Sequence, residues 1–240
     1  MALNTQVIKK WLWVAPCLLL IWLAFISLKY GSASLDYYRV KNIVEEWQNE
    51  GNQQTKRQYA SAKSAVTRAV NKHPFNPLYI DTMGQILEWG ALAGYEDNEN
   101  VSLMEAKGFY QQATHLRPTW PVTWASMAMI KWRLQEFDTE MQFYLSQADK
   151  YGPMKPEVHI LFVNLGFALY KHNHPMLLDI RQTFMNRIAL GLRNPSTRFA
   201  TLQQIQQSGV GSLICRWLKD EPDETLNFIK GCRVSAAEKS

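Results

Sequence analysis

Three cysteines are the residues of this chain best suited to covalent chemistry: Cys17, Cys215 and Cys232. Cys17 lies inside an apolar run, and the residues before it, Val14-Ala15-Pro16, do not form a lipobox, so we interpret Cys17 as a small side chain of that run. Cys215 and Cys232 are the only cysteines that follow the run. In a domain that has crossed a membrane, such a pair predicts a disulfide bond, with two buried free thiols as the alternative.

The five histidines offer little basis for a metal site. His172-Asn173-His174 holds two imidazoles, but no cluster of Cys, Asp or Glu accompanies them, and a solvated polar turn is the simpler interpretation. The sequence has no glycine-rich phosphate loop, nucleophile elbow or His-Glu-x-x-His motif. We therefore expect no metal, no cofactor and no catalytic residues; a hydrolase or transferase would need a cluster that the sequence does not show.

Charge gives a second constraint on partners. The chain has 26 Lys and Arg against 21 Asp and Glu, interspersed, without a basic tract that would follow a phosphate backbone. We therefore expect no nucleic-acid partner. The basic balance favours at most a weak attraction to anionic polymers or lipid headgroups.

Three aromatic residues are candidates for a contact patch. Trp120 stands in a turn between Pro118 and Pro121, and Trp89 and Tyr95 lie beside a long polar loop. Exposed aromatic side chains can bind peptides or stack on sugars. Packing beneath the loop is the alternative for these residues.

An uninterrupted apolar run, Trp11–Leu28, has 18 residues and no charge. A helix of this length, at about 1.5 Å per residue, covers most of a hydrocarbon core of roughly 30 Å. Lys9-Lys10 and Lys29 flank it, as expected of a membrane anchor. Gly31-Ser32-Ala33-Ser34 would suit signal cleavage, but the run exceeds the ~7–15 apolar residues of a typical signal peptide. We expect a single-pass protein of the bacterial inner membrane with a periplasmic C-terminal domain.

The rest of the chain favours an all-α domain. Apolar residues recur at helical spacing between sparse glycines and prolines, and no stretch alternates as a strand would. The pattern predicts helices at 36–49, 55–72, 77–93, 159–172, 176–192 and 194–207, followed by a break at 208–211.

A compact cap is predicted at the C-terminal end. Residues 212–218 form one short helix, and a second begins with Asp220 as its N-cap and Pro222 in its first turn and ends at Lys230-Gly231. Cys215 and Cys232 would lie at the outer ends of this pair. The predicted organisation is an N-terminus and anchor (1–30), a helical solenoid (31–207), the cap (208–233) and a disordered tail (234–240).

An internal repeat organises the predicted solenoid. Three segments share an alanine, a proline five residues later and another proline three residues after that: Ala69-Pro74-Pro77, Ala113-Pro118-Pro121 and Ala148-Pro153-Pro156. The second and third copies are 35 residues apart and the first and second 44, and the polar loop 94–100 accounts for the difference. A period in the mid-thirties is typical of stacked helix hairpins.

These details resemble the tetratricopeptide repeat, which has small residues where two helices cross, a bulky residue between them and a proline after the second helix. The positions that match are Ala62, Ala69, Pro74, Ala106, Tyr110, Ala113, Pro118, Ala148 and Pro153, with Gly84, Trp124, Ala128 and Gly166 in the opening helices. Lys131 departs from the bulky residue expected at its position. The resemblance covers about 34–207 and implies a TPR-like α-solenoid of four hairpins.

The layout as a whole, together with the Trp-rich segment Leu116–Leu134, is similar to the VpsP family of small membrane-anchored proteins in bacterial exopolysaccharide clusters. This resemblance implies support of polysaccharide assembly or export. We expect a periplasmic scaffold that binds a protein partner. The alternative is a glycan-binding module or an auxiliary subunit of a polysaccharide polymerase or exporter, and secretion, pilus assembly and cytochrome c maturation use similar architectures.

Overall fold

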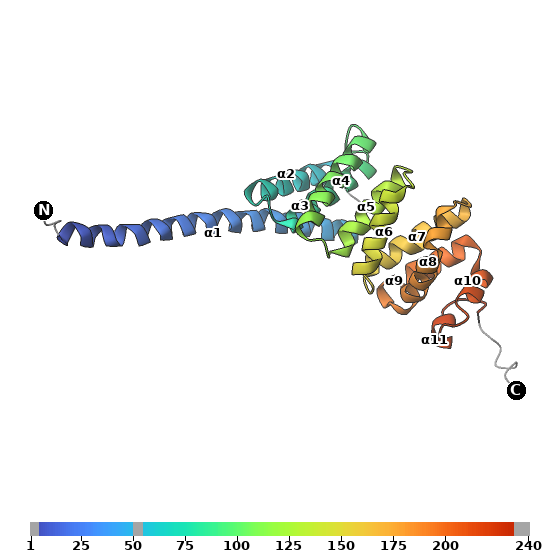
Figure 1. Ribbon diagram of the computed structural model, residues 1–240. Helices are drawn as coiled ribbons and strands as arrows, with labels where there is room; N and C mark the ends of the chain where they lie inside the picture. Colours follow the sequence, from blue (N-terminus) through green and yellow to red (C-terminus); the bar gives the residue numbers. More distant parts are fainter. Residues whose placement is uncertain (1–4, 50–54, 233–240) are drawn as a thin grey trace. The chain divides into compact units, whose positions relative to one another are not determined.

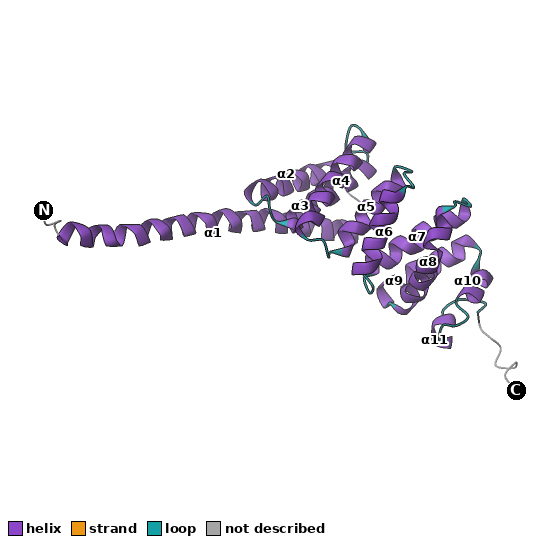
Figure 2. Cartoon of the chain, in the orientation of Figure 1, coloured by secondary structure: helices purple, strands orange, loops and turns teal. Residues whose placement is uncertain are grey.

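The computed structural model describes residues 5–49 and 55–232, and every regular element in these ranges is a helix. The all-α prediction is therefore confirmed for the described part of the chain. The chain forms two compact units, Met1–Leu116 and Arg117–Ser240. Figure 1 follows the helices in chain order, and Figure 2 shows the short turns that connect them.

The first unit begins with one long helix, α1 (Thr5–Asn49). The sequence predicted an anchor and a separate helix from residue 36, and this division is wrong, because Gly31-Ser32-Ala33-Ser34 is helical. A single glycine costs a helix only about 1 kcal/mol, and the fully buried Ala33 packs in a small cluster with Ala69 and Tyr79. The predicted anchor and the domain therefore share one helix.

The N-terminal part of α1 has the properties of a membrane span. Among the described residues, it is the one helix long and apolar enough to cross a bilayer, and its most apolar window is 0% buried. Leu20 and Phe25 are 65% and 67% exposed. Removing such surface from water is worth about 25 cal/mol per Å², so lipid is its favourable surrounding. A membrane anchor and a signal sequence both have these properties.

Beyond the apolar run, one face of α1 packs into the unit. The buried residues of this face recur at helical spacing: Ala33, Asp36, Val40, Val44 and Trp47. Asp36 accepts hydrogen bonds from Arg68 (3.1 Å) and Lys72 (2.7 Å) of α2 (Lys56–Lys72). Burial opposes the charge of Asp36, but these two bonds outweigh it and lower the pKa of the carboxyl. The carboxylate thus joins α1 to α2 inside an otherwise apolar face.

The second helix pair of this unit is α3 (Pro77–Leu92) with α4 (Glu99–Leu116). The sequence predicted a close crossing at Gly84. A Cβ atom on Gly84 would lie 2.8 Å from the ring of Tyr110 and 3.1 Å from the carbonyl oxygen of Ala106, so the close crossing is confirmed. Because only the short connection 93–98 joins these two packed helices, α3 and α4 form an antiparallel hairpin.

The second unit has two helix pairs, one further helix and a cap. The first helices of the two pairs pack against each other, and the helix that follows the second pair packs against both helices of that pair. Gly166 faces the ring of Phe184 across the second pair, with no room for a side chain. The elements are α5 (Pro121–Arg133), α6 (Thr139–Tyr151), α7 (Pro156–Lys171), α8 (Met176–Arg193), α9 (Pro195–Ser208), α10 (Gly211–Trp217) and α11 (Asp223–Leu226).

Of the positions that the repeat pattern assigned to packing, the small and aromatic residues are buried, whereas the three prolines are exposed. The alanines among them expose at most 2% of their surface: Ala62, Ala69, Ala106, Ala113, Ala128 and Ala148. Trp124 is 9% exposed, and its indole donates a hydrogen bond of 2.7 Å to the carbonyl oxygen of Pro118. Pro74, Pro118 and Pro153 lie in exposed turns after α2, α4 and α6. Small residues therefore lie inside, and a proline lies two residues after the end of α2, α4 and α6.

A disulfide bond closes the C-terminal cap, as predicted: Cys215 and Cys232 are paired, with their Cα atoms 5.3 Å apart. Their surroundings are apolar, since Cys232 is buried in a cluster with Ile214 and Leu218 of α10 and its C-terminal end. The predicted tail, 234–240, lies outside the described residues.

The second helix of the cap is shorter than predicted. α11 ends at Leu226 rather than Lys230, and Pro222, not Asp220, precedes its first residue. Backbone hydrogen bonds three residues apart follow it, from Ile229 to Leu226 and from Cys232 to Ile229. These tighter turns take the place of a helical continuation and bring the chain back to α10.

Candidate functional site

The three aromatic residues proposed as a contact patch have separate surroundings. Trp89 is half-buried, with its ring 5.6 Å from that of Trp47, and Tyr95 lies 5.6 Å from Tyr59. For these two residues, the structure agrees with the alternative of packing beside the loop. Trp120 belongs to the second unit and lies within cation–π distance of two basic side chains there, Arg117 at 4.2 Å and Lys155 at 4.8 Å.

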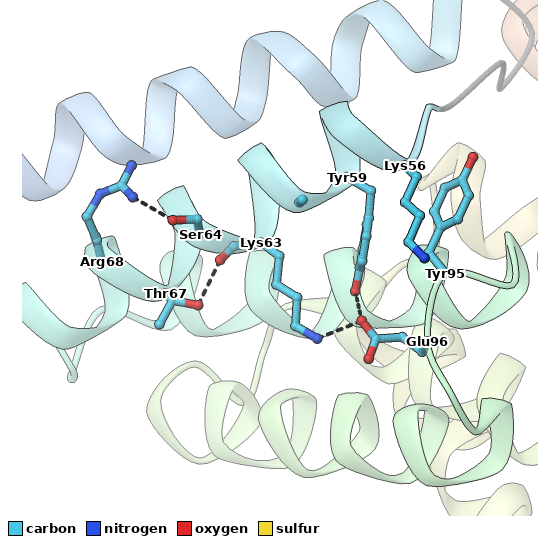
Figure 3. A pocket seen from close by; sticks show the side chains of 9 residues that line it. Lys56, Tyr59, Lys63, Ser64, Thr67, Arg68, Tyr95 and Glu96 are labelled. Atoms are coloured by element: carbon cyan, nitrogen blue, oxygen red, sulfur yellow. Dashed lines mark hydrogen bonds and ion pairs between the residues drawn. The ribbon is translucent and has the colours of Figure 1, made fainter.

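A shallow pocket of about 650 Å³ runs along α2 in the first unit and is bounded by Tyr95 and Glu96 (Figure 3). Glu96 points toward α2, where it accepts hydrogen bonds from the hydroxyl of Tyr59 and from Nζ of Lys63, the latter at 2.6 Å. Thr67, further along the pocket, bonds back to the carbonyl oxygen of Lys63 at 2.7 Å. The polar groups at the centre of this pocket are thus engaged with one another.

The charges of this pocket suit a structural role. Burial raises the pKa of Glu96, but the bonds from Lys63 and Tyr59 outweigh it and hold the pKa below its ordinary value. Burial and the same carboxylate raise the pKa of Tyr59, so the hydroxyl stays a proton donor. A carboxylate held ionised by two donors ties the α3–α4 loop to α2. It has neither the raised pKa of a general acid nor a free partner to act as a base.

A second hollow, of about 810 Å³, lies in the second unit between the opening helices of its pairs and α9. We call it the α5–α7–α9 groove. Its principal lining side chains are Trp132 from α5, Asn164, Phe167, Tyr170 and Lys171 from α7, His172 and Asn173 from the following turn, and Gln204 and Gln207 from α9.

The groove combines amides with aromatic rings. Among the residues that the structure describes, the side chains of Asn164, Gln204 and Gln207 have no hydrogen-bonding partner, although each amide can donate and accept. Trp132 and Tyr170 are half-buried beside them. Lys171 is exposed at the rim, and the described lining contains no carboxylate. Such a surface can hydrogen-bond a polar chain and cover its apolar parts. The sequence pattern missed these amides, because polar residues on a helix face resemble a solvated surface.

The His172-Asn173-His174 segment is a turn in the structure. Asn173 has a positive φ of 51°, a conformation that asparagine tolerates better than most residues. Nδ1 of His174 accepts a hydrogen bond of 3.2 Å from the backbone N–H of Met176, and its ring lies 4.3 Å from that of Phe137. The segment is thus a turn, as interpreted from the sequence, but His174 is half-buried and bonds the first residue of α8, while His172 lines the groove.

Three carboxylates in the α5–α6 connection surround a buried lysine. Nζ of Lys131 lies 2.6 Å from Glu136, 2.6 Å from Asp138 and 3.0 Å from Glu140. Burial alone would lower the pKa of Lys131, but the bonds to the carboxylates outweigh it and raise the pKa. The carboxylates are close enough together to hold a cation, and the lysine ammonium already occupies that role. Lys131 replaces the bulky residue of the repeat pattern with an ion-pair cluster.

A buried arginine forms the most extensive polar network of the second unit. Arg187 is 2% exposed and donates to Asp149 (Nε, 2.9 Å), to the carbonyl oxygens of Gly152 (2.8 Å) and Pro153 (3.1 Å), and lies 3.0 Å from Nδ1 of His159. The guanidinium thus satisfies the C-terminal end of α6 from α8. Sequence reasoning missed this network, because its members are separated by up to 38 positions. Its burial makes it structural rather than a binding site.

Comparison with known proteins adds no assignment: no protein-family model matches the chain, and a search of curated proteins finds no significant relative.

Proposed function

We propose that this protein is a membrane-anchored adaptor that binds an extended segment of a partner protein in the α5–α7–α9 groove. The observation that carries the proposal is the set of unpartnered amides, Asn164, Gln204 and Gln207, beside Trp132 and Tyr170. An extended peptide offers one backbone donor and one acceptor per residue. Side-chain amides match both, and the two rings provide the apolar contact that anchors peptide side chains.

The repeat architecture supports this use of the groove. We propose that the helix pairs belong to a TPR-like solenoid, in which the opening helices of successive hairpins form one concave surface. The buried alanines and the close approaches at Gly84 and Gly166 support it. Residues from α5 and α7, the opening helices of the two pairs, line the groove together with residues from α9.

The charge of the groove favours a particular partner segment. Lys171 and His172 line it and no described carboxylate does, so a segment with an acidic side chain or a free C-terminal carboxylate is the best match. Lysine binds such groups as a point charge and tolerates variation in their position. We therefore expect binding that weakens as salt is added.

The cellular location that we propose is supported by α1 and the disulfide. An exposed apolar helix and a cysteine pair at bonding distance support an anchored domain in an oxidising compartment, which we propose is the bacterial periplasm. The similarity of the layout to the VpsP family favours a role beside exopolysaccharide assembly or export. Carbonate washing should leave the protein in the membrane fraction, and protease added to spheroplasts should digest the C-terminal domain; protection of that domain would refute the orientation.

Direct glycan binding is the second candidate, and one observation favours it. Aromatic rings beside amide groups, as Trp132 and Tyr170 are beside Asn164, also suit sugars, whose apolar faces stack and whose hydroxyls hydrogen-bond. A glycan without carboxylates would bind independently of salt, in contrast to an acidic peptide.

Photocrosslinking from the groove tests the proposal in cells. A photoreactive amino acid replaces Gln207 in the groove or, as control, Gln182 on α8, which lies outside it. We expect a discrete protein adduct from position 207 only, and its loss when Asn164→Leu removes a groove amide. The matched change Asn186→Leu on the exposed side of α8 should leave the adduct unchanged. Equal adducts from both positions would refute the groove as the site, and a polysaccharide adduct from 207 would favour the second candidate.

A further inference from the structure

The turn between α2 and α3 lies beside the end of the apolar run. The rings of Tyr30 in α1 and His73 in this turn stack with their centroids 4.3 Å apart. Four residues further along α1, the hydroxyl of Ser34 is 2.9 Å from that of Tyr79, in the first turns of α3. Two independent contacts therefore fix the α2–α3 turn at the level of residues 30–34 of α1, and Figure 1 shows this end of α2 directed toward the N-terminal half of α1.

The part of this level nearest the apolar run, at Tyr30, lies in the interface of a bilayer spanned by α1. The apolar run ends at Leu28, and Tyr30 lies two residues further, which is about 3 Å along a helix axis. The headgroup zone extends roughly 5–7 Å beyond the hydrocarbon core on each side. Because α1 continues as one helix into the unit, this height does not depend on a flexible linker.

An apolar side chain projects from the turn at this height. Phe75 is 76% exposed, so it makes little contribution to packing within the unit. Its position is fixed, because Pro74 precedes it and Asn76 caps α3 by accepting a hydrogen bond of 3.0 Å from the N–H of Leu78. A rigid turn that presents a phenylalanine to solvent is unfavourable in water, because transfer of the ring out of water lowers the free energy.

We propose that Phe75 inserts into the membrane interface, so that the first unit contacts the bilayer through a second point besides α1. Tyrosine and tryptophan concentrate at this depth of a bilayer, and Tyr30 lies there. Phenylalanine side chains of interfacial helices are buried at the same boundary. Exposed Lys29 provides the positive charge that anionic headgroups attract. With two points of contact, the unit cannot rotate freely about the axis of α1, and its orientation on the membrane is set.

This inference rests on the proposed anchor. Three fluorescent labels distinguish a failure of the insertion of Phe75 from a failure of the anchor. Cys17→Ser removes the free thiol, and the environment-sensitive probe NBD is attached through Phe75→Cys, Val101→Cys or Leu20→Cys in the full chain, without reductant so that the disulfide persists. Val101 is the matched control: it is 62% exposed and lies in the first turn of α4, at the far end of the antiparallel α3–α4 pair. The vesicles contain phosphatidylethanolamine and phosphatidylglycerol, with or without a lipid that bears a nitroxide quencher near the top of its acyl chain.

We expect the labels at positions 75 and 20 to emit at shorter wavelength than the label at 101 and to lose intensity with the quenching lipid. A label at 75 that behaves like the one at 101, while the label at 20 is quenched, would overturn the insertion of Phe75 and leave the anchor intact. Loss of quenching at both 20 and 75 would refute the anchor itself. Shielding at 75 that requires an added protein rather than lipid would show a protein-binding site and also overturn the proposal.

Discussion

His159 is expected to make the second unit lose stability as the pH falls. The ring is 1% exposed, and its Nδ1 lies 3.0 Å from Nη1 of Arg187. A guanidinium only donates, so Nδ1 accepts and the ring proton resides on Nε2. Burial, followed by the charge of Arg187, lowers the pKa of His159 from 6.5 to about 4, and the carboxylate of Glu157 opposes this only in part.

The sign and size of the effect follow from this pKa. Because the folded state has the lower value, the unfolded chain takes up a proton first as the pH falls. The contribution of His159 to the free energy of unfolding is fully present above pH 6.5, the ordinary pKa of histidine. It is lost progressively as the pH falls to about 4, the pKa in the folded state. At about 1.4 kcal/mol per tenfold change in proton affinity, the loss amounts to about 3 kcal/mol. That is a substantial part of the roughly 5–15 kcal/mol that stabilises a typical domain.

Hydrogen exchange measured peptide by peptide tests this prediction in the full chain. His159→Gln keeps an acceptor for Arg187 but cannot titrate between pH 7 and pH 4. In the natural protein, peptides of α7 and α8 should lose protection between pH 7 and pH 4, after correction for the intrinsic exchange rate. In the variant, the free energy of opening of these peptides should fall by about 3 kcal/mol less. His115→Gln, at an exposed position of the first unit, is the control and should change nothing. Parallel losses in the natural protein and His159→Gln would refute the reasoning, since the carboxylates titrate in both.

Three further predictions concern packing and the cap. Ala113→Leu, at a site 2% exposed, should cost roughly 1–3 kcal/mol in denaturant unfolding, whereas Gln112→Leu on the exposed side of α4 should change stability by less than about 0.5 kcal/mol. Gly166→Ala should lower the melting temperature, because the added methyl meets the ring across the α7–α8 pair, at a cost of roughly 1–3 kcal/mol; an unchanged melt would contradict the close approach. Replacing Cys215 and Cys232 by serine should cost about 3 kcal/mol for a bridge of 17 residues and expose α10 to proteolysis before α7; thiol labelling of the unreduced, denatured protein checks the bridge itself.

Helix boundaries were predictable where the signals are local. Thr55 caps α2 together with Gln58, and Asn76 and Asn194 cap α3 and α9 directly before a proline. Each of these caps bonds backbone N–H groups within a few residues of itself, so the local sequence is sufficient to predict it. The predicted helices at 55–72 and 77–93 accordingly end within one residue of those observed.

Boundaries that depend on tertiary contacts were not predictable in this way. Glycine and serines at 31–34 usually indicate a break, but Ala33 is buried against the unit and the helix continues. At the other end of the chain, local signals favoured a helix from Asp220 to Lys230. The pairing of Cys232 with α10 coincides with tighter turns there instead.

The buried polar groups were beyond local reasoning for the same reason. Lys131 broke the apolar pattern, and only the fold shows that Glu136, Asp138 and Glu140 converge on its ammonium. Those carboxylates follow within nine positions, so a lysine at a core position with acids in the next loop is a signal that could have found them. Arg187 has no such signal, because its partners in α6 and α7 are set by how the helices pack.

The groove, by contrast, is lined by residues that recur with a regular period but do not belong to the buried stripe. Trp132, Ala168 and Gln204 all line it and are 36 positions apart, close to the 35 that separates two of the proline turns. A repeat places equivalent residues on one surface, so the face opposite the buried stripe must also recur at that period. The unpartnered amides on this face contribute nothing to the packed stripe, whereas the rings of Phe167 and Tyr170 also contact Phe184 and Trp217 within the unit. If partner binding uses this row, its free energy is spread over three helices. Single substitutions at Trp132, Ala168 or Gln204 should then weaken binding by moderate and nearly additive amounts. A substitution at Gly166 would disturb the spacing between α7 and α8 and weaken the contacts at these three positions together.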